Sequence, residues 1–325
     1  MKLNLQLSCY NGARYLPYLF ASLKKQTRQG WHLFVLDNAS RDEDRIGIQK
    51  AVAESGLPIT LFRLEKNIGF AGAHNFLFEK HKVGSELVQL LNDDAILEPT
   101  YLEKVADYLE DNSECAAASG LIYRWDFEFR DRIEGGKMVI LDSLGLGVKA
   151  TGKVEDLGAG KMLPNNFVFA AHSVFGVSGC LPMYKTSAVN WVSFDGPLFD
   201  ASYVIYKEDV DLAFRLQTAG FKAALVSGAV AYHRRSLGVG SKVKPSYEAH
   251  YGSYRNHLWL VAAHLGSPRL PIKSWAVIPF EAAKLGYWLI RSPKIAFGAW
   301  RETFKQWPRL KEKRKFMKSV IGKNI

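Results

Sequence analysis

The first third of the chain alternates short apolar runs with longer stretches in which apolar residues recur every three or four positions. Short apolar runs are typical of buried strands, and the three-to-four spacing is typical of helices that pack on a sheet. The expected strands cover residues 3–7, 31–36, 59–64 and 87–91, and the expected helices cover residues 15–26, 45–55, 70–82 and about 100–110. This alternation predicts an α/β fold with a Rossmann-like, mostly parallel central sheet flanked by helices.

The pattern becomes irregular after this region. Residues 125–165 are rich in glycine and weakly periodic, so we expect an extended loop or small hairpins there. Long loops within compact domains are usually functional, which makes this segment a candidate for closing over a substrate. Regular spacing returns in an expected helix over residues 208–220 and an expected short strand over residues 223–226.

Polar residues gather where the expected strands end. Asp37 follows the second strand, and Asn92-Asp93-Asp94 directly follows the fourth. The carboxyl ends of parallel strands form the edge at which open α/β sheets bind ligands. Two adjacent carboxylates repel one another, and Mg²⁺ relieves that repulsion because it binds one or two carboxylates together with substrate phosphates. An acidic turn that caps the next helix explains Asp93 and Asp94 equally well.

Asp37 and the glycines near residue 70 each allow two interpretations. The Asp37 carboxylate can accept a hydrogen bond from the imide N–H of uracil or thymine, or it can close an Asx-turn in Asp-Asn-Ala-Ser. Residues 67–75 open a helix with two glycines. These glycines let the backbone approach a ligand near the N–H donors of a helix start, although tight packing of the helix on a strand explains them as well.

A second acidic cluster begins the helix expected at residue 208. Lys207-Glu208-Asp209-Val210-Asp211 holds three carboxylates, one more than helix capping requires. A hydroxyl attacks more readily when a positioned carboxylate removes its proton, an effect of roughly 10²–10⁴ in rate, and Asp209 is the candidate base. The alternative is that these carboxylates only complement the helix dipole. His233, after an apolar run, can complete a metal site begun by two carboxylates, although a single histidine is more often structural.

The composition fits a folded intracellular protein. A chain of 325 residues with 48% hydrophobic residues can bury a substantial core. The three cysteines, Cys9, Cys115 and Cys180, are widely spaced and fit neither a disulfide framework nor a structural zinc site. The first residues alternate like a strand and lack the continuous apolar run of a secretory signal, so we expect the protein in the cytoplasm.

The net charge of +11 lies entirely in the last part of the chain. Residues 266–325 hold 14 Lys and Arg against 3 Asp and Glu, so the preceding residues are neutral overall. A basic tail on a neutral body predicts attachment to an anionic surface. Because the body has no excess positive charge, we expect an anionic membrane surface and no nucleic-acid partner.

The tail has the pattern of helices that lie on a membrane. The apolar stretch from residue 274 to 290 contains Glu281 and Lys284 and is short for a spanning helix of roughly 20 apolar residues. Further on, aromatic residues recur at helical spacing with basic residues between them, and residues 311–315 add a basic cluster. The four aromatic residues are Phe297, Trp300, Phe304 and Trp307. This arrangement favours an interfacial amphipathic helix, with packing of the aromatics on the preceding domain as the alternative.

Nine short motifs follow one another along roughly residues 1–260. They are Ser8-Cys-Tyr-Asn-Gly-Ala-Arg-Tyr-Leu, Asp37-Asn-Ala-Ser, Asn67-Ile-Gly-Phe-Ala-Gly-Ala-His-Asn, Asn92-Asp-Asp, Leu141-Asp-Ser-Leu-Gly, Val174-Phe-Gly-Val-Ser-Gly, Glu208-Asp-Val-Asp-Leu-Ala-Phe-Arg-Leu, Tyr232-His-Arg-Arg-Ser and Tyr254-Arg-Asn. Their order resembles the family-2 inverting glycosyltransferases, and within them the bacterial rhamnosyltransferase-like branch. The resemblance implies a GT-A fold in residues 1–265, with a nucleotide-binding half over about 1–115 and an acceptor-binding half over about 116–265. Residues 266–325 are then the basic, helical membrane-surface tail.

The resemblance also implies roles for individual residues. The donor-binding set would be Ser8, Asn11, Asp37, Asn67, Gly69 and Asp93, in which Ser8 and Asp37 hold a pyrimidine. Asp94 and His233 would bind Mg²⁺ or Mn²⁺, and Glu208 and Gly179 would contact the acceptor. Two departures stand out: Ala73 occupies a position where relatives often have a second glycine, and Asp93-Asp94-Ala95 replaces the more common Asn-Asp-Thr. The second departure leaves the share of Asp93 in metal binding open.

The expected reaction is one in-line displacement at the anomeric carbon, with Asp209 deprotonating a hydroxyl of a saccharide or lipid-linked saccharide. By resemblance alone the first donor is dTDP-L-rhamnose, followed by UDP-galactofuranose or another UDP-hexose, and the setting is cell-envelope polysaccharide synthesis on the inner face of the membrane. A nucleotidyltransferase also binds Mg²⁺ at sheet ends but has no need for the Glu-Asp-x-Asp helix start. A non-catalytic nucleotide-sugar-binding protein would have no need for the base candidate.

Overall fold

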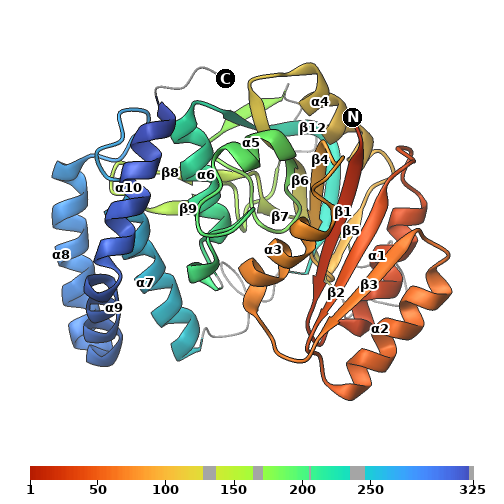
Figure 1. Cartoon of the computed structure of the whole chain (residues 1–325), viewed down its shortest axis with the longest axis horizontal. Helices are drawn as coiled ribbons and strands as arrows, with labels where there is room; N and C mark the ends of the chain where they lie inside the picture. Colours follow the sequence, from red (N-terminus) through yellow and green to blue (C-terminus); the bar gives the residue numbers. More distant parts are fainter. Residues whose placement is uncertain (127–136, 164–170, 205, 235–245, 322–325) are drawn as a thin grey trace.

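The computed structural model describes residues 1–126, 137–163, 171–204, 206–234 and 246–321. Within these ranges it is a mixed α/β protein built on a central sheet with the strand order β10-β12-β6-β11-β4-β1-β2-β3, beside which β5 pairs with β12 and β7 pairs with β6 (Figure 1). A separate hairpin joins β8 and β9. The expected α/β class with flanking helices is confirmed.

The first half of the sheet forms as the apolar pattern predicts. Its strands are β1 (Leu3–Cys9), β2 (His32–Asn38), β3 (Ile59–Leu64) and β4 (Leu87–Leu91), and all of their pairings with one another are parallel. Their crossovers run through α1 (Leu16–Lys24), α2 (Asp42–Ser55) and α3 (Gly69–His81), and a short 3-10 turn, η1 (Ala13–Tyr15), precedes α1. Every residue of β4 is buried, as a strand covered on both faces requires.

The second half departs from the expected parallel arrangement. Its strands are β5 (Ala95–Leu97), β6 (Cys115–Trp125), β7 (Lys137–Ser143), β10 (His172–Val174), β11 (Met183–Lys185) and β12 (Lys222–His233). β11 lies between β4 and β6 and runs antiparallel to both. The loop that leads into β11 contains no crossover helix in its described residues, and a strand that returns without one enters a sheet antiparallel. The sheet is therefore mixed, and only β6 and β12 are parallel neighbours in this half.

Helices cover both faces of the sheet. On one face α1, α2 and α4 (Tyr101–Asp111) pack on Leu3, Leu5 and Leu7 of β1. On the other face α3, α5 (Thr186–Trp191) and α6 (Glu208–Ala219) pack on Val88 and Leu90 of β4. A 3-10 turn, η3 (Ala201–Tyr203), lies a few residues before α6. The N-terminus of α6 is thereby fixed against the sheet.

The glycine-rich region contains small hairpins, as expected, in the part that the structure describes. β6 and β7 pair antiparallel, and β8 (Leu146–Val148) pairs with β9 (Val154–Asp156). Residues 127–136, 164 and 165 of the proposed closing loop lie outside the described ranges.

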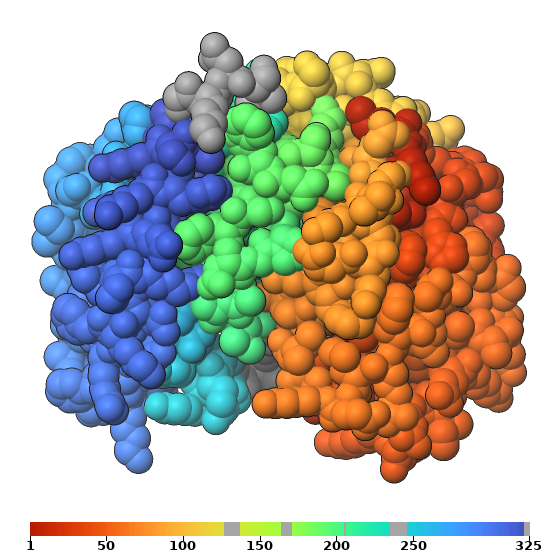
Figure 2. Space-filling model, viewed as in Figure 1, coloured from red at the N-terminus to blue at the C-terminus, as the bar shows by residue number. Residues whose placement is uncertain are grey.

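Four helices end the chain: α7 (Tyr247–His264), α8 (Ser274–Arg291), α9 (Pro293–Lys305) and α10 (Trp307–Ile321). Met317 and Val320 of α10 share a core with Leu212 and Leu216 of α6. In Figure 2 the surface of these helices, in blue, meets the green surface of the segment around α5. The contacts there include the rings of Phe194 and Phe316, with centroids 5.6 Å apart. Among the described residues, no helix has both the length and the apolar content needed to cross a bilayer.

Two details of the expected surface tail are corrected. The Trp300 indole is turned towards α7 and donates from Nε1 to the Tyr254 hydroxyl at 3.0 Å, because a packed indole N–H needs an acceptor. Phe297 and Phe304 remain exposed. Within the basic run 311–315, Lys313 is fully buried and paired with two aspartates, so this run is not a single solvated cluster.

Candidate active site

A cavity of about 510 Å³ opens where β1, β2 and β4 end and where α3 and α6 begin. Nine of the eleven residues predicted for the site line it. They are Ser8, Asn67, Gly69, Asp93, Asp94, Gly179, Glu208, Asp209 and His233. The fold therefore brings together residues that lie more than two hundred positions apart in the sequence.

Asp94 and His233 face one another in this cavity. His233 Nε2 lies 3.2 Å from Asp94 Oδ1, because the antiparallel pairing of β5 with β12 sets His233 opposite Ala95. Asn92 Nδ2 lies 3.3 Å from the same nitrogen. An imidazole nitrogen and a carboxylate at this separation are two ligands that a divalent cation can bind.

The other ring nitrogen of His233 is held by Asp142, a residue that was not among the predicted site residues. Nδ1 lies 2.8 Å from Asp142 Oδ2, and Asp142 is 2% exposed. Metal-binding histidines commonly donate their second N–H to a carboxylate, which fixes the tautomer and the ring orientation. Burial alone would lower the pKa of His233, but Cys180 and the carboxylates of Asp94 and Asp142 raise it well above its usual value. The only sequence signal for Asp142 is its place in Leu-Asp-Ser-Leu-Gly.

The protein supplies few metal ligands of its own. Within the described ranges, no three or more His, Cys, Asp and Glu side chains converge on one metal position. A cation at Asp94 and His233 would therefore take its remaining ligands from phosphates and water, which is how Mg²⁺ usually binds in nucleotide sites. The donor set fits a divalent cation that enters with a nucleotide.

Asp93 lines the cavity, and the backbone at Gly12 passes close to its carboxylate. The Cys9 thiol donates to Asp93 Oδ2 at 3.2 Å, and a Cβ added at Gly12 would lie 1.8 Å from the same oxygen. Burial and the neighbouring charge of Asp94 raise the pKa of Asp93 to about 7. Only glycine fits at position 12 while Asp93 keeps this orientation.

Glu208 and Asp209, at the start of α6, share the cavity but differ in hydrogen bonding. Asp209 Oδ2 accepts from the Gly179 N–H at 2.8 Å, and Oδ1 accepts from the Val210 N–H at 2.7 Å. Oε2 of Glu208 is buried and has no hydrogen-bond partner among the described residues. Burial and the charge of Asp209 raise the pKa of Glu208 to about 8. Burial also raises the pKa of Asp209, while its two backbone donors lower it.

The segment that leads into α6 is conformationally strained. Val204, Tyr206 and Lys207 have φ values of 60°, 66° and 70°, and the first carries a β-branched side chain. Each such residue costs on the order of 1–3 kcal/mol, and strain of this kind collects at functional sites. This segment also contacts the predicted nucleotide site, since a Cβ on Gly69 would come within 2.6 Å of the Val204 carbonyl oxygen.

Asn38 organises the nucleotide side of the cavity and was not among the predicted site residues. Its Nδ2 donates to Asn67 Oδ1 at 3.1 Å, and its Oδ1 accepts from the Ile68 N–H at 3.0 Å. Asn67 Oδ1 in turn accepts from the Gly69 N–H at 2.8 Å. Asn75, the last residue of the motif that begins at Asn67, makes hydrogen bonds with the backbone of Phe199 and therefore has a structural role.

Asn11 and Asp37 lie outside the cavity wall. Asp37 is 2% exposed and its Oδ1 accepts from the Ser40 N–H at 2.9 Å, which is the Asx-turn that its sequence allows. Asn11 Oδ1 accepts from the Arg41 N–H at 2.9 Å and ties the loop after β1 to the loop after β2. Asn11 lines an adjoining surface groove, so its donor-binding role stays a prediction, as does that of Asp37.

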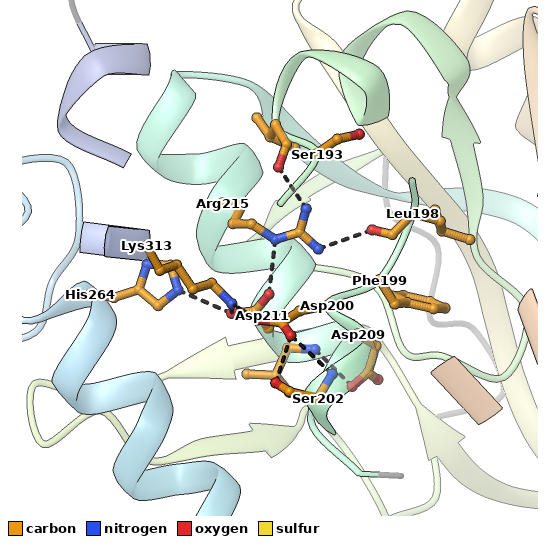
Figure 3. A network of polar contacts seen from close by, with 12 residues as sticks. Ser193, Leu198, Phe199, Asp200, Ser202, Asp209, Asp211, Arg215, His264 and Lys313 are labelled. Atoms are coloured by element: carbon orange, nitrogen blue, oxygen red, sulfur yellow. Dashed lines mark hydrogen bonds and ion pairs between the residues drawn. The ribbon is translucent and has the colours of Figure 1, made fainter. Parts of the chain in front are cut away.

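A buried ion network holds α6 in place from behind (Figure 3). Lys313 Nζ of α10 lies 2.6 Å from Asp200 Oδ2 and 2.5 Å from Asp211 Oδ1. Asp211 Oδ2 accepts from Arg215 Nε at 2.8 Å, and His264 of α7 also reaches Asp211. Burial would raise the pKa of Asp211, but Lys313 and Arg215 hold it well below its usual value. Two C-terminal helices thus fix the helix that begins with Glu208 and Asp209.

The comparisons with known proteins agree with this geometry. Residues 7–163, just under half of the chain, match the model of the family described as glycosyl transferase family 2. A search of curated protein sequences finds no match.

Several solved structures are similar in fold. GalNAc-T7, crystallised with UDP, GalNAc and Mn²⁺, is 13% identical with a TM-score of 0.62, over 81% of this chain and 48% of that one. The mannosyltransferase PcManGT from Pyrobaculum calidifontis, in complex with GDP-Man and Mn²⁺, is 15% identical with a TM-score of 0.51, over 98% and 85% of the two chains. Residues 1–349 of S. aureus TarS are 15% identical with a TM-score of 0.53, over 99% and 89%.

At these identities the structures show the fold alone, and the chain spans about half the length of the first of them. The family match, in contrast, covers the motifs from the end of β1 to the acidic end of β4 and the Asp142 motif, which form part of the cavity wall, while His233, Glu208 and Asp209 lie beyond it. Residues 7–163 are therefore similar to glycosyl transferase family 2, and the described chain has a GT-A-like fold.

Proposed function

We propose that the protein is an inverting, metal-dependent glycosyltransferase that transfers a sugar, L-rhamnose from dTDP-L-rhamnose in the first instance, to a saccharide hydroxyl. The observation that carries this proposal is the position of Asp209, which lines one cavity with Asp94 and His233. A displacement at an anomeric carbon is served by a base and a bound metal ion in one polar cavity, because the base activates the acceptor and the metal ion stabilises the leaving group. Asp209 can supply the base, and Asp94 and His233 can supply two metal ligands.

Asp209 accepts the proton of the acceptor hydroxyl as the hydroxyl oxygen attacks the anomeric carbon. The backbone N–H groups of Gly179 and Val210 hold its carboxylate in one orientation. Glu208 stays protonated near neutral pH, since its pKa is raised to about 8. A protonated Glu208 can donate a hydrogen bond to the acceptor and adds no second negative charge beside the base.

Asp94 and His233 are the residues that would hold the cation, with Asp142 orienting the imidazole. When bound, Mg²⁺ or Mn²⁺ neutralises charge on the departing nucleoside diphosphate. GalNAc-T7 and PcManGT were both crystallised with Mn²⁺, which supports a divalent cation in this chain too. Those two structures also contain UDP and GDP-Man, which supports a nucleotide-sugar donor.

The preference for dTDP-L-rhamnose rests on the resemblance of the motifs to the rhamnosyltransferase-like branch, with UDP-galactofuranose or another UDP-hexose as the next donors. For the acceptor we propose a lipid-linked saccharide of a cell-envelope polysaccharide, and for the location the inner face of the cell membrane. The support is the basic charge of residues 266–325 on an otherwise neutral chain.

The test is a thermal-shift screen of the full-length protein against nucleotide sugars with Mn²⁺ present. A ligand that binds only the folded state raises Tm, so the true donor stands out from the panel. We expect dTDP-L-rhamnose to give the largest shift and EDTA to remove it. A shift with nucleoside triphosphates but with no nucleotide sugar would replace glycosyl transfer with nucleotidyl transfer.

A further inference from the structure

In helix α8 the charged residues of the middle turns face the protein and the apolar residues face outward, which is the reverse of an ordinary surface helix. Its only acidic residue, Glu281, is buried, with Oε1 2.5 Å from His257 Nε2 of α7. Lys284 is turned the same way, with its ammonium 5.0 Å from the centre of the Tyr254 ring. Both charged groups in the middle of the helix therefore face the protein.

The exposed side chains of α8 are mostly apolar, and among them Tyr287, which is 57% exposed, carries a hydroxyl. Trp275, Ile278 and Ile290 are 76%, 67% and 90% exposed, and Leu289 is 40% exposed. The positions between them at helical spacing, Pro279, Ala282 and Ala283, are exposed and carry no polar group either. α8 lies at the outer edge of the molecule, away from the sheet (Figure 1). A soluble surface helix normally shows the opposite pattern, with polar residues outward.

Basic residues border this face at the junction of α8 with α9. Arg291 and Lys294 are exposed at the junction, and Arg301 and Lys305 are exposed further along α9. Phe297 and Phe304 stand between them and are 69% and 67% exposed. Apolar and aromatic side chains edged by Lys and Arg match an anionic bilayer, whose headgroups attract the basic residues while its acyl chains accept the apolar ones.

The charges also argue against a second copy of the chain as the occupant. A symmetric dimer in which the two copies of α8 run parallel would bring the Arg291 and Lys294 pairs of both copies to one apolar contact. No acidic residue is exposed on α8 to balance them. A spanning role is excluded for α8, since among the described helices none is long and apolar enough.

We propose that α8 inserts its outward face, formed by Trp275, Ile278, Leu289 and Ile290, into the interface of an anionic bilayer, parallel to the surface. This inference rests on the proposed function only for the identity of the acceptor. The inward face of α8 is joined through α7 to the segment before α6, since Glu281 pairs with His257 and the neighbouring Asn256 donates from Nδ2 to the Tyr206 carbonyl oxygen at 2.7 Å. Helix α7 thus links the lipid-facing helix to the segment that precedes the proposed base, which suits a lipid-linked acceptor.

Flotation of the full-length protein with phosphatidylcholine vesicles, with and without phosphatidylglycerol, tests the insertion. We expect the wild type to float with the anionic vesicles, and Ile278→Ser/Ile290→Ser to bind at least about tenfold more weakly, because two large side chains no longer leave water. The matched control is Ile46→Ser/Val83→Ser, which changes side chains that are 60% and 89% exposed elsewhere on the surface and should bind like the wild type. Lys294→Gln/Arg301→Gln should weaken binding to the anionic vesicles and leave any weak binding to pure phosphatidylcholine unchanged.

Three outcomes would overturn the proposal. The wild type stays unbound with both kinds of vesicle, or the Ile278→Ser/Ile290→Ser variant binds as tightly as the wild type. In the third, light scattering finds a wild-type dimer that this variant converts to a monomer without any vesicle binding, and the face then belongs to a second copy. Transfer to a soluble acceptor is measured separately for each variant, so a protein that floats but transfers no sugar overturns the proposed function and leaves the insertion standing.

Discussion

At the residue scale, the two carboxylates that begin α6 have different surroundings, and in the proposed mechanism they have different tasks. Asp209 has two backbone donors that favour its charged form, whereas the Oε2 of Glu208 has none among the described residues. A carboxylate that stays charged can accept a proton, and a carboxyl that stays neutral can donate a hydrogen bond. This difference supports Asp209 as the proposed base.

Asp209→Asn should lower kcat by at least about 10²–10⁴ and leave donor affinity nearly unchanged, since an amide keeps the shape but cannot take the proton. Steady-state kinetics gives kcat, and a titration with the donor in the absence of acceptor gives the dissociation constant. If donor affinity falls as far as kcat does, Asp209 belongs to the donor site instead.

Glu208→Gln should change how stability depends on pH. In the folded protein the pKa of Glu208 is raised from its ordinary value of 4.5 to about 8, so the folded state keeps a proton that the unfolded chain releases within this window. The free energy of unfolding therefore falls as pH rises from about 4.5 to 8, and a neutral glutamine removes that part of the slope.

Melting curves between pH 5 and pH 9 measure this effect. The Tm advantage of Glu208→Gln over the wild type should be near zero at the acid end, grow through the window and level off above it. Glu54→Gln, at a residue whose side chain is 67% exposed, is the control and should follow the wild type throughout. A difference that does not vary with pH would mean that Glu208 is not held protonated.

Asp142→Asn should weaken metal binding by about 10–100-fold, because the amide no longer holds His233 as a carboxylate does. A Mn²⁺ titration in the presence of the nucleoside diphosphate measures the affinity directly. Asp156→Asn changes another carboxylate of the same cavity, one that accepts a hydrogen bond from the Ser143 hydroxyl at 3.1 Å, and it should leave the Mn²⁺ affinity in place. Equal losses in both variants would contradict the orienting role.

Most of the cavity could be predicted at this scale, and the exceptions have physical reasons. Acidic residues at strand ends and at a helix start are local signals, so Asp94 and Asp209 were visible in the sequence. Asp142 lies in the irregular glycine-rich region, and its partner is 91 residues away. The Asn38 side chain forms a hydrogen bond with Asn67, 29 residues further along the chain, and no local sequence pattern predicts such a contact.

At the element scale, the composition of α10 gives a wrong prediction of which of its basic residues are exposed. Lys-Glu-Lys-Arg-Lys reads as a solvated run, yet Lys313 within it is fully buried, and its partners Asp200 and Asp211 are more than a hundred residues earlier. The buried partners of a lysine cannot be read from its neighbours in the chain. The basic charge of the tail is consequently smaller at the surface than its sequence suggests.

Lys313→Met should destabilise the protein by about 3–5 kcal/mol, since it leaves Asp200 and Asp211 buried near one another without their shared cation. Urea denaturation of the purified variant measures the free energy of unfolding. Lys318→Met lies on an exposed position of the same helix and should stay within about 0.5 kcal/mol of the wild type. Similar stability of the two variants would show that the network is dispensable.

At the scale of the whole molecule, the two halves of the sheet differ in how far the sequence predicts them. β1 to β4 follow the apolar runs closely, because each is a buried strand separated from the next by a full helix. β6 begins Cys-Ala-Ala-Ala-Ser-Gly, which has little strand propensity, and β11 has only three residues. Their places depend on pairing with β4 and β12, which only the assembled sheet supplies.

The helices after residue 265 pack on α6 and α7, and a shortened chain tests whether the protein needs them to fold. A protein that ends at Leu265 keeps every predicted site residue but loses Lys313 and Arg309, which between them pair with Asp195, Asp200 and Asp211. It also uncovers the side chains of α6 and α7 that pack on Leu310, Met317 and Val320. We therefore expect the shortened protein to aggregate or to melt far below the full-length protein.

The matched control ends at Ile321 and keeps all four C-terminal helices. It should melt like the full chain, since every contact just named is retained. Size-exclusion chromatography and a thermal melt of the three proteins decide the outcome. A soluble, cooperatively folded chain ending at Leu265 would mean that the network around Lys313 is not needed to hold α6, and that the last helices serve surface binding alone. Aggregation of that chain, with normal melting of the control, would show that the C-terminal helices are part of the folded domain that contains the site. The ion network on α6 and the proposed lipid-facing side of α8 would then belong to one packed unit.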